Sequence, residues 1–496
     1  MSQLFARKPI EDLQPPGGDG PSLERVLGAG DLIMLAIGAV IGAGIFGAIG
    51  TAAAGQIGPG GEVIRYGAGP ALIFSFILLG GACALAALCY AELAAMIPQA
   101  GSAYAYAYAT LGELVAWIIG WDLILEYAIG NVAVAISWGD YFTTLLRGIG
   151  VDLPVWLTTG YRTAALSANP EVRGLIDTAP QVAGLPLLVN LPAFGIVLFV
   201  TWLLLKGVRD SSSANNAMVV VKLLAIGLFI AVGVTSLDTS LYVPFAPNGF
   251  AGVHQGAAIV FFAYIGFDAV STAAEETKNP QRNLPIGILG GLAVCTVIYV
   301  VVGAVLTGMV PYDQLGVADP LSRALELAGY SGVGSVVALG AVVSMTAVLL
   351  VFQYGQPRIF FSMARDGLLP PWAARVDART RIPRAATLVT GVLVALASLV
   401  GDAAETYDLT NIGTLFAFAL VCAGVLVLRV VEPDRYRPFK VPYVWLVAPL
   451  GVAACVFVMT GLPRQAWERF GVWLLLGAVA YLAYGYRHSR LRGRAG

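Results

Sequence analysis

Long apolar stretches alternate with short polar ones along nearly the whole chain. An apolar helix of about 20 residues crosses roughly 30 Å of hydrocarbon, and twelve stretches approach or exceed this length. They lie near 31–54, 69–97, 113–142, 190–208, 213–236, 252–276, 285–310, 333–363, 384–402, 407–430, 442–462 and 470–487. The pattern predicts an all-α polytopic membrane protein with 12 transmembrane helices.

The composition supports this class and excludes others. Of the 496 residues 58% are hydrophobic and 12% are charged, with a mean hydropathy of +0.79, whereas soluble chains carry about 25% charge. The net charge of -1 argues against a nucleic-acid partner. Two distant histidines and five singly placed cysteines give no metal-ligand spacing. We therefore expect no nucleic-acid partner and no metal, and membrane lipid as the surroundings of the chain.

The positive charges predict an orientation, because Lys and Arg accumulate in cytoplasmic loops. With the N-terminus inside, 21 of the 29 Lys and Arg residues fall in cytoplasmic segments, seven, including Arg65, fall outside, and Lys222 lies within a span. We expect cytoplasmic tails at 1–30 and 488–496. The polar insertions 55–68 and 147–189 are expected to form external loops with short helices.

Glycines interrupt two of the spans at corresponding places. Gly42 and Gly44 lie near the middle of the first span, and Gly266 interrupts an aromatic run in the sixth. Small residues also allow close helix packing, which is the alternative for the first span alone. Two such breaks at the starts of two five-span halves, 31–236 and 252–430, are typical of inverted-repeat transporters, with 442–487 as two additional helices.

Broken helices expose backbone groups that suit an α-amino acid. The N-terminal end of a half-helix attracts a carboxylate, and the C-terminal end attracts an ammonium group. Unsatisfied backbone groups at membrane depth persist only where they line a cavity or a site. The sequence therefore predicts a substrate site between the first and sixth spans.

Several long segments resemble a known family. They read IGAGIF (41–46), CYAELAAMIPQAGSAYAYAYATLGEL (89–114), IGWDLILEYAIG (119–130), FFAYIGFDAVSTAAEETKNPQRNLPIGI (261–288) and RIFFSMARDGLLP (358–370). The chain resembles bacterial members of the cationic amino acid transporter family in the amino acid–polyamine–organocation superfamily, over residues of about 23 to 460. The resemblance implies a LeuT-like fold, with ten core helices in two inverted repeats and two peripheral helices. It also implies alternating access and, in many bacterial members, proton-coupled uptake.

Lys222 lies about nine residues into the fifth span, near the depth of Gly42. Burial disfavours the charged form of a lysine, so such a group can load and release a proton in the physiological range. By resemblance, Lys222 matches a lysine that replaces a sodium ion of sodium-coupled relatives and serves proton coupling. The alternative is a permanently charged lysine that bonds carbonyls of the unwound first span, and both roles can hold together.

Two buried acids are substrate-site candidates, because ionisable groups inside spans are costly. Glu126 in the third span, where the family also has a glutamate, can receive a cationic side chain or can be a protonated packing residue. Asp268 follows the break in the sixth span and can bond freed amides or the substrate ammonium, or simply cap the helix. Asp122, four residues before Glu126 on the same helical face, is expected in the inner vestibule or in packing.

The first break supplies the expected carboxylate site. Ile41, Gly42, Ala43 and Gly44 are assigned to substrate binding through the match with IGAGIF. Some relatives have Ser or Thr in place of Ala43. Without that hydroxyl, backbone amides near Gly42, Ala43 and Gly44 remain for the carboxylate.

The remaining pocket residues are assigned by resemblance to the sixth span and by position elsewhere. Phe262, Ala263 and Ile265 match pocket positions of the family, with Phe262 as a lid over the substrate. Tyr299 in the seventh span and Phe352 in the eighth are further candidates. A bulky Phe352 facing the site would shorten the room for arginine and favour smaller substrates, whereas Glu126 favours cationic ones.

These observations predict a proton-coupled symporter of L-amino acids in the inner membrane. Sodium coupling is disfavoured by Lys222, and no other cofactor is expected. An amino acid or polyamine exchanger without net proton movement is the first alternative, and a transporter-like sensor is the second. The sequence holds no phosphate loop with a lysine and no nucleophile with a nearby histidine base, so we expect no enzyme. The oligomeric state is open, with a monomer as the default.

Overall fold

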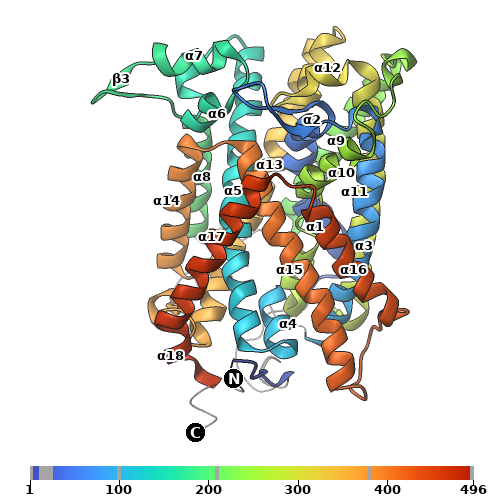
Figure 1. Cartoon of the computed structure of the whole chain (residues 1–496), viewed down its shortest axis with the longest axis vertical. Helices are drawn as coiled ribbons and strands as arrows, with labels where there is room; N and C mark the ends of the chain where they lie inside the picture. Colours follow the sequence, from blue (N-terminus) through green and yellow to red (C-terminus); the bar gives the residue numbers. More distant parts are fainter. Residues whose placement is uncertain (1–3, 11–25, 98–101, 207–211, 378–381, 492–496) are drawn as a thin grey trace.

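A bundle of long helices that run in roughly the same direction or its reverse dominates the computed structural model (Figure 1). The structure describes residues 4–10, 26–97, 102–206, 212–377 and 382–491. Within these residues, eight helical stretches are long and apolar enough to cross a membrane. They contain α3 (Leu72–Met96), α5 (Glu113–Gly148), α9 (Ser212–Thr235), α10 (Gly249–Val260), α11 (Pro280–Met309), α13 (Ser331–Arg365), α15 (Ala403–Val431) and α17 (Arg464–Ala480). The chain is therefore a multi-pass helical membrane protein, as the hydrophobic pattern predicts.

Further apolar helices coincide with the remaining predicted spans. The first span is a pair bent by 46°, with α1 (Ala29–Val40) before the bend and η2 (Gly44–Ala48) and α2 (Ile49–Ala54) after it. Three shorter apolar helices are α8 (Leu191–Leu205), α14 (Arg384–Val400) and α16 (Val444–Met459). Each overlaps a predicted segment, but their length alone does not establish that they cross the membrane, so the count of twelve stays a prediction.

Local sequence explains where two of the helices begin. The Asn190 side chain accepts a hydrogen bond from the Ala193 amide at the start of α8, where Pro192 occupies the first turn. The Asp402 side chain accepts from the Glu405 amide at the start of α15. Both are N-cap arrangements that satisfy amides without a helical partner.

Both termini lie at one end of the molecule, which we call the terminal face, and the two polar insertions lie at the opposite end, which we call the hairpin face (Figure 1). The insertions contain the expected short helices, α6 (Tyr161–Leu166) and α7 (Pro170–Thr178). They also contain two small antiparallel hairpins that the sequence pattern did not predict. These are β1 (Gly55–Ile57) with β2 (Val63–Tyr66), and β3 (Gln181–Val182) with β4 (Leu185–Pro186).

Short elements complete the described chain. They are η3 (Gly69–Ala71), α4 (Ser102–Thr110), η4 (Val155–Leu157), η5 (Thr239–Tyr242), η6 (Phe261–Tyr264), η7 (Asp268–Glu276), η8 (Tyr312–Leu315), α12 (Pro320–Leu327), η9 (Pro371–Ala374), η10 (Tyr481–Gly485) and α18 (Tyr486–His488). η6 and η7 matter most, because they follow α10 and replace its regular helix.

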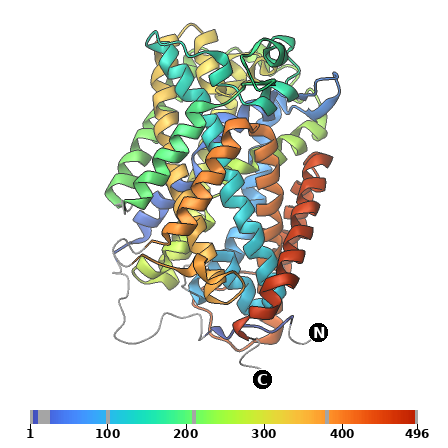
Figure 2. The ribbon, with the colours of Figure 1, turned by 90° about the vertical axis from the view of Figure 1, so that its left-hand side faces the viewer.

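The helices pack in pairs around the two interrupted ones. α3 packs on α11, α5 on α13 and α8 on α14, while α1 contacts α9, α11 and α13. α16 and α17 both pack on α15, and α17 lies along one edge of the bundle (Figure 2). The interrupted helices are thus enclosed on several sides, and the polar groups that they expose must be satisfied by their neighbours.

Candidate functional site

The first span is interrupted at Ile41–Ala43, at the predicted place. α1 ends at Val40, Ile41 has an extended backbone, and regular turns resume at Gly44. Side chains from two other helices bond the carbonyls at this end. Lys222 Nζ of α9 donates to the oxygens of Gly38 (2.7 Å) and Ile41 (2.8 Å), and Ser344 Oγ of α13 donates to the Ile41 oxygen (2.9 Å).

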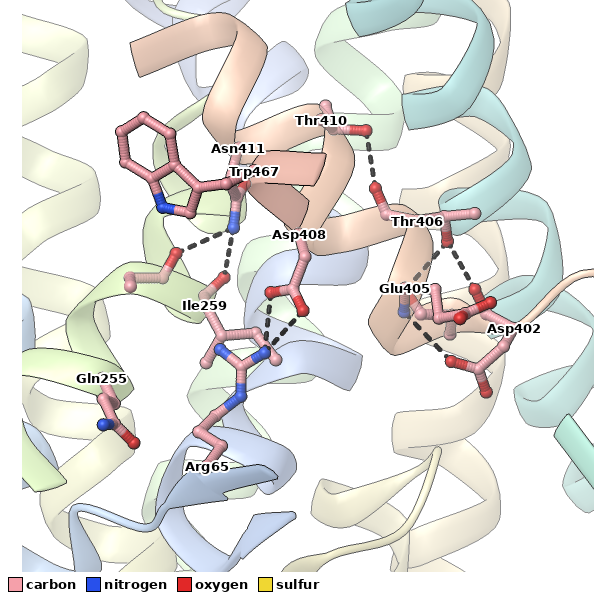
Figure 3. A network of polar contacts seen from close by, with 12 residues as sticks. Arg65, Gln255, Ile259, Asp402, Glu405, Thr406, Asp408, Thr410, Asn411 and Trp467 are labelled. Atoms are coloured by element: carbon pink, nitrogen blue, oxygen red, sulfur yellow. Dashed lines mark hydrogen bonds and ion pairs between the residues drawn. The ribbon is translucent and has the colours of Figure 1, made fainter. Parts of the chain in front are cut away.

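The sixth span is interrupted between α10 and η7. Ile265 is extended and Gly266 has φ +115°, a backbone conformation that favours glycine. Asn411 Nδ2 of α15 donates to the carbonyls of Ala258 (2.9 Å) and Ile259 (3.0 Å) at the end of α10 (Figure 3). The carbonyl groups near this break therefore have a side-chain donor, as those of the first break do.

The two breaks contact each other directly. A Cβ atom added to Gly44 would lie 2.5 Å from the Ala263 nitrogen, and one added to Gly266 would lie 2.9 Å from the Ala39 carbonyl carbon. Tyr299 OH of α11 lies 3.1 Å from the Val40 oxygen and 2.8 Å from the Ala263 oxygen, so it bridges the breaks. Glycine at 44 and 266 thus lets two irregular backbones approach each other closely.

Lys222 is fully buried between α9 and the end of α1. Its two carbonyl contacts are charge-assisted when the amine is protonated, and such hydrogen bonds are about twice as strong as neutral ones. The ammonium group thus occupies a place where carbonyl oxygens converge, which is the kind of place that a small cation would otherwise take.

The predicted acids form a second group beside the breaks. Glu126 and Asp268 are buried and close enough to interact electrostatically, and Asp122 also interacts with Glu126. Both oxygens of Asp122 and one of Asp268 lack a hydrogen-bond partner among the described residues. The carboxyl group of Glu126 faces Thr414 of α15. This geometry is compatible with both roles considered for Glu126, which are contact with a cationic substrate and packing between helices.

Two aromatic residues lie near the breaks. The ring of Phe262 lies 4.6 Å from that of Tyr407 in α15. Phe352 of α13 packs on Tyr127 of α5, with 5.4 Å between ring centroids. Phe352 lies one helical turn after Val348. A Cβ atom added to Gly42 would lie 2.7 Å from the Val348 side chain. Phe352 is thus placed near the first break, on the side of α5 and Glu126.

The structure brings several of the predicted site residues together, and all of the predicted residues are buried. Ile41, Gly44, Ala263, Tyr299 and Lys222 belong to one connected set of contacts. Sequence reasoning missed three residues that bond or cover the breaks. These are Ser344, Tyr407 and Asn411. Asn411 is an amide inside an apolar span, which is a usable signal; a serine among small residues, as at 344, is not.

Nothing in the described residues suggests a metal centre, since no group of three His, Cys, Asp or Glu side chains is placed to hold an ion. The five cysteines are free and buried. The chemistry available at the breaks is hydrogen bonding and charge, which suits binding of a polar small molecule.

Comparison with known proteins identifies the family of the chain. The family model described as amino acid permease matches residues 27–477. The chain is 45% identical to the branched-chain amino acid permease BcaP of Bacillus subtilis, over 98% of this chain and 99% of that protein. It is 44% identical to the methylthioribose transporter of the same organism, over 99% of this chain and 100% of that protein.

More distant relatives extend the comparison to plants. Cationic amino acid transporter 4, vacuolar, of Arabidopsis thaliana is 37% identical over 88% of this chain and 68% of its own length. These relatives are named as permeases or transporters and not as enzymes. The chain belongs to the amino acid permease family of the amino acid–polyamine–organocation superfamily, and it is a membrane transporter rather than an enzyme.

Proposed function

We propose that this permease is a proton-coupled symporter that binds an L-amino acid between the interrupted segments of its first and sixth spans. The observation that carries the proposal is the direct contact between the two breaks, at Gly44 and Ala263. In this arrangement the amides near Gly42, Ala43 and Gly44 would take the substrate carboxylate. Carbonyls at the ends of the half-helices would take its ammonium group.

Lys222 is the proposed proton carrier. Its amine bonds Gly38 and Ile41 on the α1 side of the break. When the ammonium releases a proton, these charge-assisted bonds weaken and the end of α1 is freer to move. Proton release and movement of the first span are thus linked through two carbonyl oxygens. In the same contacts the ammonium group of Lys222 takes the place that a sodium ion would have among these carbonyls. This supports protons as the coupling ion.

The proposed organisation consists of two inverted repeats, at 31–236 and 252–430. Residues 442–487 lie outside the repeats. Each repeat begins with an interrupted span. α3, α5 and α8 of the first repeat pack on α11, α13 and α14, their counterparts in the second. Counterparts related by a two-fold axis contact each other in this way when they lie near the axis. The substrate would lie between the repeats, where rocking of one against the other alternates access.

The excess of Lys and Arg in the predicted inner segments supports a cytoplasmic terminal face and an external hairpin face. The cell membrane is the proposed location, with both tails, 1–30 and 488–496, in the cytoplasm.

The substrate that we propose is a neutral aliphatic amino acid. Phe352 places a large ring near the first break, which reduces the room for an arginine side chain. A relative that matches nearly the whole chain is named for branched-chain amino acids. Glu126 favours cationic substrates, and another full-length relative is named for methylthioribose, so arginine and methylthioribose are the necessary competitors.

Uptake into proteoliposomes tests the proposal. Labelled leucine, arginine and methylthioribose are each offered with and without an inward proton gradient. The variants compared are Lys222→Ala and, as a matched control, Lys206→Ala, which removes a lysine at the end of α8 whose amine lies over the Trp202 ring. We expect leucine uptake to follow the gradient in the native protein and in Lys206→Ala but not in Lys222→Ala.

The other outcomes separate the alternatives. Uptake that ignores the gradient but requires internal amino acid identifies an exchanger and makes Lys222 structural. Binding without any uptake identifies a sensor. Faster uptake of arginine or methylthioribose than of leucine overturns the substrate assignment while leaving the coupling intact.

A further inference from the structure

A buried ion pair joins the first hairpin to α15 at the hairpin face. Arg65 of β2 reaches inward, and its Nη2 atom lies 2.7 Å from both carboxylate oxygens of Asp408 (Figure 3). The residues are 2% and 5% exposed. An arginine from a polar loop is thereby enclosed in the body of the protein, although the sequence places it among solvent-exposed loop charges.

The pair adjoins the residues of α15 that contact the second break. Tyr407, the residue before Asp408, packs on Phe262, and its hydroxyl is hydrogen-bonded to Ser137 of α5. Asn411, one turn after Asp408, bonds the end of α10. The same two turns of α15 therefore carry the ion pair, the aromatic contact with Phe262 and the bonds to the second break.

β2 packs on α10, but few hydrogen bonds tie the hairpin itself to the rest of the described chain. The Tyr66 amide donates to Gln255 Oε1 of α10 (2.7 Å), and Arg173 of α7 donates to the Pro59 carbonyl (3.0 Å). Removal of the Arg65 contact would leave a small two-stranded sheet held at its edges. Isolated two-stranded hairpins are only marginally stable in water, so the ion pair and the packing of β2 on α10 together hold this segment in place.

The ion pair is incompletely satisfied, which suits a contact that opens. Arg65 Nε and Nη1 have no hydrogen-bond partner among the described residues, although a guanidinium has five donors. Burial of two charges has a large desolvation cost that the attraction between them only partly offsets. Opening would return these unused donors and the carboxylate to water, so the open and closed arrangements can be close in free energy.

We propose that Arg65 and Asp408 form the latch of an external gate. When the pair is closed, the hairpin and Tyr407 seal the path to Phe262. When it opens, an amino acid can enter from outside. The inference rests on the proposed function for its orientation and for the path of the substrate. Neither residue touches the breaks, so both are positioning residues.

A neighbouring acid provides the matched control. Glu405, on the first turn of α15, is bound by Arg162 of α6 through Nε (2.6 Å) and Nη2 (2.7 Å), and also by Arg469 of α17. The Arg162 side chain is half exposed. Arg162→Ala therefore removes an arginine that also binds α15 at the hairpin face. It leaves the buried contact between Arg65 and Asp408 in place.

The test measures access from outside with a membrane-impermeant thiol reagent on proteoliposomes or intact cells. Ser137→Cys, buried beneath the pair beside Tyr407, reports the gate. Val182→Cys shows whether the hairpin face is accessible from outside, because Val182 of β3 is 60% exposed. Arg65→Ala, Asp408→Asn and Arg162→Ala are each combined with Ser137→Cys. Arg65→Ala without an added cysteine gives the background from the five buried native cysteines.

We expect the thiol introduced by Ser137→Cys to react at least tenfold faster in the Arg65→Ala and Asp408→Asn backgrounds than in the parent or in Arg162→Ala. Monodisperse elution and an unchanged background rate show that the variants are folded. A rate within twofold of the Arg162→Ala control in both folded variants overturns the latch. If the thiol introduced by Val182→Cys fails to react from outside, the proposed orientation is wrong. Because labelling needs no transport, its result is independent of the substrate and of proton coupling.

Discussion

Gly44 offers a steric test of the proposed site, because its substitution changes only the contact between the two breaks. In Gly44→Ala, the new Cβ would lie 2.5 Å from the Ala263 nitrogen and comparably near other Ala263 atoms. Non-bonded heavy atoms are comfortable at about 3.5 Å, so the two backbones must separate by about 1 Å. Two of the three obstructing atoms belong to the Ala263 backbone and the third is its Cβ atom, so none of them can rotate away.

The expected magnitude follows from the cost of overpacking. Forcing an extra methyl group into a packed site costs about 1–3 kcal/mol. If that cost falls on the closed, substrate-binding arrangement, affinity falls by about fivefold to about 150-fold, since 1.4 kcal/mol corresponds to a factor of ten. The change removes no polar group, so any loss reflects the spacing of the breaks.

The assay is equilibrium binding of labelled leucine in detergent, followed by uptake in proteoliposomes. Gly81→Ala and Gly227→Ala are the controls, because a Cβ at either position meets no atom within 4 Å. We expect both controls to bind as the native protein does. If folded Gly44→Ala binds leucine within twofold of the native affinity, the contact between the breaks does not shape the substrate site.

Four further outcomes are expected. Tyr299→Phe loses the hydroxyl that bridges Val40 and Ala263. We expect leucine affinity to fall by about twofold to tenfold, since a hydrogen bond contributes about 0.5–1.5 kcal/mol. Unchanged leucine binding would contradict this role of the hydroxyl. Lys222→Met removes the lysine hydrogen bonds to the buried carbonyls of Gly38 and Ile41, and Ile41 keeps its bond from Ser344. Loss of the donor to Gly38 costs about 1–3 kcal/mol, so thermal unfolding should occur at lower temperature. Native uptake should also rise as external pH falls from 8 to 6, while uptake by Lys222→Met stays flat; a native pH response in the variant would refute the role of the lysine. Phe352→Ala should raise arginine uptake relative to leucine uptake, and an unchanged ratio would place Phe352 away from the substrate side chain.

The sequence predicts the interrupted spans well because their signals are local. Gly42 and Gly44 break an otherwise apolar run, and the first break lies there. Lys222 stands out for the same reason, since a charged residue in an apolar span must find polar partners. Its partners are the carbonyls of the unwound first span, which the alternative interpretation of Lys222 also anticipates.

Features that depend on distant pairing were not predictable in this way. Arg65 has the sequence context of a loop charge, and its burial depends on Asp408, 343 positions away. The hairpin of β1 and β2 has only three and four residues per strand, which is too short for a clear alternation of apolar and polar positions. Tyr407 and Ser344 acquire their roles only when α15 and α13 pack against the breaks.

Proton movement measured directly tests the central claim. Proteoliposomes that contain a trapped pH-sensitive dye receive external leucine without a preset proton gradient, with the membrane potential clamped by potassium and valinomycin. The account predicts acidification of the interior that requires leucine, persists in Lys206→Ala and is absent in Lys222→Ala. Entry of labelled leucine into the same vesicles without acidification would contradict it.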